Sequence, residues 1–176
     1  MNTPENEIYP GFAALGGFGV VPPEVLASMS GLDMLRKMIS GELPAPMISR
    51  TLSFGLTEAE EGRVVFKGLP KAEHLNPAGT IHGGWTATIM DSALACCVQT
   101  VLKKGEAFTT TEFKLNLIRP ITPETGEVAC EASVVSRGRT IGVSEARLRD
   151  SRGKILAFGT ETCSIFPAPG AARAEK

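Results

Sequence analysis

The sequence predicts an α+β fold in which one long helix packs against an antiparallel sheet. Three observations favour it: apolar and polar residues alternate through most of the second half of the chain, short turn-forming segments separate these runs, and one long apolar segment near the middle lacks the alternation. The chain has 176 residues, 43% hydrophobic and 21% charged, which suits one globular domain with a substantial core.

The chain divides into an N-terminal extension (residues 1–46), a main domain (residues 47–167) and a flexible tail (residues 168–176). Within the extension, apolar residues recur at helical spacing over residues 24–39, and Gly41 follows as a stop signal. We therefore expect a helix here that packs on the main domain.

The main domain is predicted to contain two strands, one long helix and then a meander of strands. The long helix is expected at residues 84–102, because two lysines and a glycine follow it, as is typical of a helix C-terminus. The first two strands are expected at residues 47–54 and 62–69, joined by a polar segment. The later strands are expected around residues 113–117, 128–134, 144–148 and 154–166.

Charge and cysteine content argue against several classes of function. Eighteen basic and nineteen acidic residues give a net charge of -1, so nothing points to nucleic acid or an anionic membrane as a partner. No apolar run approaches the roughly 20 residues that span a bilayer, and we expect no secretory signal. Four cysteines and two histidines lack metal-ligand spacing, so we expect no metal site and reduced thiols in a cytoplasmic protein.

The long helix carries one charged residue, Asp91, among apolar residues on all sides. An ionised carboxylate without partners is unfavourable in such a setting, so Asp91 must find partners, reach water or shift its pKa. Two interpretations stay open. Asp91 either emerges at a surface gap or caps a neighbouring loop, or it acts as a base or nucleophile in a dry cleft.

The segment before this helix, residues 76–84, is rich in glycine. Free N–H groups at a helix start form a positive pole that can hold an oxyanion, although an ordinary helix start uses similar residues. Gly83 and Asp91 are separated by about 12 Å along a helix that rises 1.5 Å per residue. One carbonyl group cannot contact both on the same helix, so their joint action on one substrate requires a dimer with shared sites.

The segment EHLNPAGTIHGGWTATIMD, residues 73–91, resembles the signature of hotdog-fold acyl-CoA thioesterases, among them the phenylacetate-pathway (PaaI) type. The resemblance extends in element order over residues 50–166. It implies a hotdog fold, with a long central helix wrapped by a curved antiparallel sheet. It also implies a homodimer with one continuous sheet, often paired again into a dimer of dimers.

The resemblance also implies roles for particular residues. The Gly83 N–H polarises the thioester carbonyl, and Asp91 of the other protomer is the general base or the nucleophile. Asn76 helps to position water or the thioester, and His82 shapes the loop and contacts the substrate. The activity is hydrolysis of an acyl-CoA to a carboxylic acid and free coenzyme A.

Some relatives hold the attacking water with a serine or threonine at the start of the strand after the helix. The corresponding residue is Thr110. Strict alternation places Thr110 on the polar side of the strand with Glu112. A bulge in the strand, or the use of Thr111, are the two ways to resolve this conflict.

Substrate contacts are predicted at two places. The Arg137-Gly138-Arg139 segment between two strands offers guanidinium groups to the phosphates of coenzyme A, with an ordinary solvated turn as the alternative. Side chains near the helix line an acyl pocket or, alternatively, belong to the core. The substrate-contact candidates at the helix and the following strand are Gly84, Trp85, Met90 and Phe113.

Thioester hydrolysis suits these residues because a thioester carbonyl is electrophilic and its thiolate leaves readily. No catalytic triad, metal or separate cofactor is needed, since coenzyme A is part of the substrate. Two alternatives remain. One is a non-catalytic acyl-CoA binding or sensing protein. The other is a hotdog hydratase or dehydratase, which needs a catalytic histidine paired with an acid on the helix.

Overall fold

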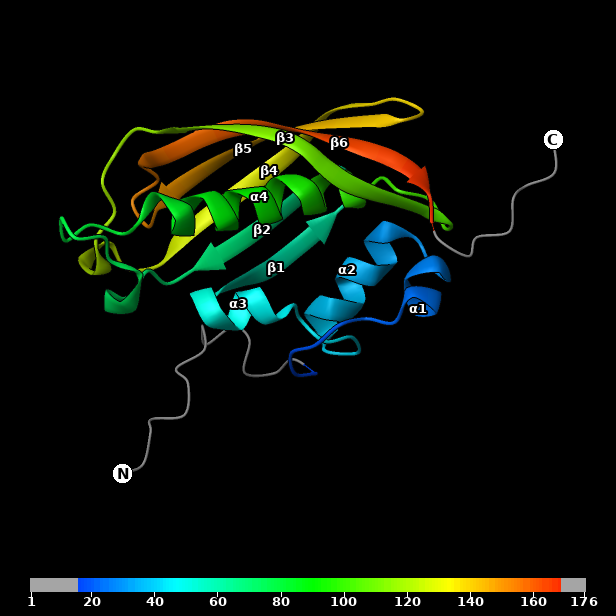
Figure 1. Cartoon of the computed structure of the whole chain (residues 1–176), viewed down its shortest axis with the longest axis horizontal. Helices are drawn as coiled ribbons and strands as arrows, with labels where there is room; N and C mark the ends of the chain where they lie inside the picture. Colours follow the sequence, from blue (N-terminus) through cyan, green and yellow to red (C-terminus); the bar gives the residue numbers. More distant parts are fainter. Residues whose placement is uncertain (1–15, 169–176) are drawn as a thin grey trace.

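A six-stranded antiparallel sheet curves around one long helix, α4, in the computed structural model, which describes residues 16–168 (Figure 1). The strand order in the sheet is β1-β2-β4-β5-β6-β3. The strands are β1 (Phe54–Glu60), β2 (Arg63–Gly68), β3 (Glu106–Leu117), β4 (Val128–Arg137), β5 (Ile141–Asp150) and β6 (Ile155–Pro167). The predicted α+β architecture is confirmed.

Four α-helices and two short 3-10 helices complete the described part of the chain. The α-helices are α1 (Pro23–Ala27), α2 (Gly31–Ser40), α3 (Met47–Leu52) and α4 (Gly83–Gln99), and the 3-10 helices are η2 (Ala72–His74) and η3 (Pro123–Thr125). No helix within residues 16–168 combines the length and apolarity needed to cross a membrane.

Helix α4 forms the centre of the core. Ile89, Met90 and Leu94 are completely buried between α4 and the concave face of the sheet. The helix approaches β5 so closely that a Cβ atom at Gly142 would lie 2.5 Å from Val98 Cγ1, which explains a glycine there. The sequence predicts burial of α4 on nearly every side, but the face that carries Ala87, Asp91 and Ala95 is only partly buried, because the sheet covers the other side of the helix.

The N-terminal extension forms two helices where the sequence predicts one. Ser30 interrupts the predicted helix because its side chain caps α2, accepting a hydrogen bond from the Asp33 N–H at 3.2 Å. Gly41 ends α2 in a left-handed conformation, as its position predicts. Helix α2 packs against β1 and α4 and buries Leu35 in the main core. Residues 1–15 of the extension and 169–176 of the predicted tail lie outside the described residues.

The strand predicted at residues 47–54 is wrong, because this segment forms helix α3 and the first strand starts at Phe54. Pro46 at the N-cap and Ser53 in a left-handed conformation (φ 52°) delimit the helix. Its apolar Met47 and Ile48 are each 46% exposed, so their hydrophobicity does not report a buried strand. Strand β1 instead occupies the predicted polar connector, since an edge strand keeps one face in water.

Candidate active site

A pocket of about 310 Å³ opens at the N-terminus of α4. Gly83 and Thr86 of the helix line it, together with Asn76 and Thr80 of the preceding loop. The end of β3 and the segment that follows it form the opposite wall together with Leu156 of β6. The residues of β3 and of the following segment that line the pocket are Leu117, Ile118, Arg119, Pro120 and Ile121. The N-terminus of a helix therefore borders a pocket large enough for part of a small molecule.

Asn76 fixes the loop that forms one wall of the pocket. Its Nδ2 donates to Thr80 Oγ1 at 2.8 Å, and its Oδ1 accepts from the Ala78 N–H at 2.9 Å. Gly79 adopts a left-handed conformation (φ 80°) at the turn between them. Both ends of the Asn76 amide are used within the loop, so its visible role is to shape the pocket wall.

His82 and the two glycines after it form the start of α4. His82 Nδ1 accepts a hydrogen bond from the Gly84 N–H at 2.9 Å and so caps the helix. The predicted binding residue Gly84 thus has its N–H engaged by His82. In contrast, no acceptor for the Gly83 N–H lies within residues 16–168. The Gly83 N–H is therefore an unengaged donor, among the described residues, at the positive pole of the helix.

Asp91 lies two turns further along α4, is partly buried, and does not line the pocket at Gly83. Its side chain makes hydrogen-bonding contacts with Glu161 and Thr110. Burial raises the pKa of Asp91, and these contacts partly offset that rise. Asp91 thus finds polar partners inside the fold, which favours a carboxyl group held in a defined position over one that simply emerges into water.

A bulge in β3 brings Thr110 to Asp91. The pairing of β3 with β6 shifts register between Thr110 and Glu112, which breaks the alternation of side chains. Thr110 Oγ1 donates to Glu161 Oε1 at 2.8 Å, whereas Thr111 is exposed and its Oγ1 donates to the Thr162 carbonyl at 2.7 Å. Of the two threonines, the structure places Thr110 beside the carboxyl groups.

Glu161 of β6 is the residue that our sequence reasoning missed. Its side chain is completely buried, and Oε1 accepts from Thr110 and from Cys163 Sγ, the latter at 3.2 Å. Burial raises its pKa to about 7. A signal was available: Glu161 shares the inward register of β6 with Gly159, Cys163 and Ile165, so an acid stands among residues that face the core.

Two of the predicted acyl-pocket residues belong to the core. Trp85 is buried, its Nε1 donates to the Leu52 carbonyl at 2.8 Å, and its ring stacks on His74. Met90 is completely buried in the main core. Phe113 lies on the edge strand β3 and is 43% exposed. None of the three lines the pocket at Gly83.

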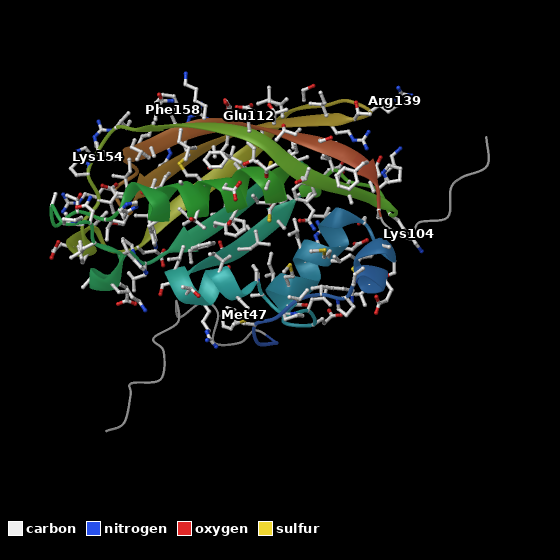
Figure 2. All side chains as sticks on the ribbon, viewed as in Figure 1. Met47, Lys104, Glu112, Arg139, Lys154 and Phe158 are labelled. Carbon is white, nitrogen blue, oxygen red and sulfur yellow. The ribbon has the colours of Figure 1, made fainter. Side chains whose placement is uncertain are left out.

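The Arg137-Gly138-Arg139 segment forms the turn between β4 and β5. Arg137 Nη2 contacts both carboxylate oxygens of Glu106 at 2.6 Å, so its guanidinium is engaged in an ion pair. Arg139 is exposed at one end of the molecule, and Lys154 lies at the opposite end (Figure 2). Within one chain the structure does not bring this turn to the pocket at Gly83.

A basic groove adjoins the pocket at Gly83. This groove, of about 500 Å³, shares Arg119, Pro120 and Leu156 with the pocket, and Arg152 and Lys154 add two further cations. Glu124 and Asp150 also line it, so its character is mixed but cationic overall. The sequence placed Arg152 only in the link between two predicted strands and Lys154 at the start of the second of them. Separately, no three potential metal ligands cluster anywhere in the described part of the chain.

The chain is similar to several known proteins that are described as esterases or thioesterases. The family described as "Thioesterase superfamily" matches residues 78–157, which include Gly83, Asp91 and Thr110 but not Asn76 or Glu161. A putative esterase of Caenorhabditis elegans is 33% identical over 112 residues, which cover 62% of this chain and 64% of that protein. The chain thus matches slightly less than two thirds of this relative's length.

Two further relatives are matched over most of their length. Human acyl-coenzyme A thioesterase 13 is 29% identical over 135 residues, covering 73% of this chain and 91% of that protein. A crystal structure from Ralstonia eutropha, titled a putative thioesterase and phenylacetic acid degradation-related protein, superposes with a TM-score of 0.68 at 26% identity. That superposition covers 74% of this chain and 98% of the other.

Proposed function

Because this chain resembles hotdog-fold thioesterases of the PaaI type, we propose that it hydrolyses an acyl-coenzyme A thioester to a carboxylic acid and free coenzyme A. The observation that carries this proposal is the pocket at the start of α4, where the Gly83 N–H has no acceptor among the described residues. A carbonyl oxygen bound there is polarised by the N–H and by the positive pole of the helix.

In the proposed reaction, Asp91 acts as general base toward water. The water oxygen forms a bond to the thioester carbon while Asp91 takes the water proton, and the Gly83 N–H stabilises the negative charge that develops on the carbonyl oxygen. The carbon–sulfur bond then breaks, and the proton passes to the sulfur of the departing coenzyme A. Thr110, beside the carboxyl groups, orients the attacking water.

The proposed active site combines two copies of the chain. Gly83 and Asp91 stand about 12 Å apart along one helix, too far for one carbonyl. Strand β3 is an edge of the sheet, and it exposes Phe113 and Leu117. Pairing β3 with its own copy in an antiparallel register centred between Phe113 and Lys114 sets Thr110 of one subunit opposite Leu117 of the other. Leu117 borders the Gly83 pocket, so this pairing brings Asp91 toward the partner's pocket.

We extend the proposal to the assembly and the surroundings of the enzyme. The dimer formed through β3 is expected to pair again into a dimer of dimers. All four cysteines are unpaired, and burial raises the pKa of each thiol, which suits a reducing compartment such as the cytoplasm. The phosphates of coenzyme A are proposed to bind Arg152 and Lys154 in the basic groove, which adjoins the pocket at Gly83.

A thiol-release assay on a panel of acyl-CoAs tests the proposed function. The wild-type protein should release coenzyme A from at least one substrate, and Asp91→Ala should lower kcat at least 10²-fold, a typical general-base contribution. Circular dichroism of the variant should remain that of the wild type. Binding of every acyl-CoA without turnover would favour the sensing alternative, and unchanged turnover in Asp91→Ala would remove Asp91 from the mechanism.

A further inference from the structure

Glu161 is a buried carboxyl group for which the proposed reaction gives no role. We propose that Glu161 is a positioning residue that shares one proton with Asp91 and, by donating it in a hydrogen bond, holds the Asp91 carboxylate in the orientation needed to act as base. This inference rests on the proposed function, because it assigns a task to the neighbour of the proposed base.

The hydrogen bonds of Glu161 leave one oxygen for this role. Oε1 accepts from Thr110 Oγ1 at 2.8 Å and from Cys163 Sγ at 3.2 Å. Oε2 is buried and has no conventional hydrogen-bond partner among the described residues, while the side chain contacts Asp91. A buried carboxylate oxygen without a donor is strongly unfavourable, so a proton on Oε2, directed at Asp91, satisfies both groups.

Within residues 16–168, no positively charged group acts on this pair to offset two carboxylates. The groups that influence the charge of Glu161 or Asp91 are Cys96 on α4, Cys163 on β6 and the Thr110 hydroxyl on β3. Burial raises the pKa of both thiols, so both stay neutral at physiological pH. In the sheet, Glu161 pairs with Phe113 on one side and Ser144 on the other, neither of which is charged.

A single proton shared by the pair is therefore the favourable state near neutrality. Two carboxyl groups in contact lose their protons in two separate steps, and burial together with the charge of Asp91 raises the second, on Glu161, to a pKa of about 7. Above this pH both groups are ionised and repel each other, so Asp91 loses its fixed orientation. The proposal thus links the alkaline limit of activity to Glu161.

The pH dependence of kcat in Glu161→Gln tests this role. Wild type should show a bell-shaped profile, with an acid limb from Asp91 and an alkaline limb near pH 7. Glu161→Gln preserves the shape of the side chain and a donor toward Asp91, and it should keep the acid limb and lose the alkaline one, with KM nearly unchanged. Glu145→Gln on β5, a partly exposed neighbour paired with Arg147, is the matched control and should retain the bell shape. An alkaline limb that survives in Glu161→Gln would overturn the proposal.

A measurement without turnover separates this inference from the proposed function. In ¹³C NMR of glutamate-labelled wild-type protein, one carboxyl resonance should titrate near pH 7, and it should vanish in Glu161→Gln. In Asp91→Asn the same resonance should titrate at lower pH, because the neighbouring negative charge is gone. If the active enzyme contains no glutamate that titrates above pH 6, the shared proton is refuted. A titrating Glu161 in a protein that hydrolyses no acyl-CoA would instead refute only the proposed function.

Discussion

The two functional regions of α4 are built in different ways. The pocket at its start is organised locally: Asn76, Thr80, His82 and Gly84 hydrogen-bond to one another within nine residues of sequence. The carboxyl region in the middle of α4 is organised by long-range contacts, since Thr110 and Glu161, which are 51 residues apart, meet at Asp91. A site built from local contacts can be recognised in the sequence, whereas a site built from long-range contacts depends on how the whole sheet packs.

Substitutions in the two regions should therefore have different effects. The loop at residues 76–84 lies at the rim of the fold, so changes there should alter binding and polarisation of the carbonyl with little effect on the core. Glu161 is completely buried, so changes there should alter both stability and catalysis.

The largest effect is expected at the Gly83 N–H. Gly83→Pro removes the donor at the first position of α4, where a helix tolerates proline. We expect kcat to fall about 10²- to 10³-fold, as for loss of an oxyanion donor. Gly83→Ala is the control, because it keeps the N–H and its Cβ would meet only the flexible tip of Leu117, at 3.0 Å. Equal losses in the two variants would show that shape, and not the donor, matters at this position.

The next effect tests whether the two regions come from different subunits. Asp91→Ala and Gly83→Pro should each be nearly inactive, but a 1:1 mixture that exchanges subunits should recover about a quarter of wild-type activity, because half of the dimers are mixed and each has one intact site of two. Thiol release after refolding the mixture measures this recovery. Each variant refolded alone is the control, and a mixture no more active than its parents would place both groups in one subunit.

A smaller effect concerns stability and pH. The pKa of Glu161 is raised on folding, so its protonation stabilises the folded state below about pH 4.5, and this contribution is lost as pH rises through about 7. The loss in the free energy of unfolding is on the order of 3 kcal/mol. Urea unfolding at pH 5 and pH 8 should show this decrease in wild type and in Glu145→Gln. Glu161→Gln should show a flatter dependence, and an identical slope in all three would contradict the raised pKa.

The smallest effect separates the two candidate phosphate sites. The double substitution of Arg152 and Lys154 by alanine should raise KM for an acyl-CoA about 5-fold without changing kcat, and the increase should shrink at high salt. Arg139→Ala, at the opposite end of the molecule from Lys154, should change KM less. The reverse ranking would favour the Arg137-Gly138-Arg139 turn, supplied by the partner subunit.

The sequence alone determined the helix, the meander and the loop before the helix. Alternation with period two survives in strands that bury one face, and a helix that is apolar all round needs no neighbour to be recognised. Asp91 stood out for the same reason, as the only charge on that helix. These features depend on residues close together in sequence.

Tertiary structure decided the rest. Residues 47–52 form a helix and not a strand, because burial, which the sequence does not report, decides whether Met47 and Ile48 mark a core face. The bulge that turns Thr110 toward the carboxyl groups depends on how β3 pairs with β6. Glu161 became a partner of Asp91 only through the fold, since strand register brings a distant residue to the helix. Contacts between residues far apart along the chain are set by packing of the whole sheet, which no local pattern encodes.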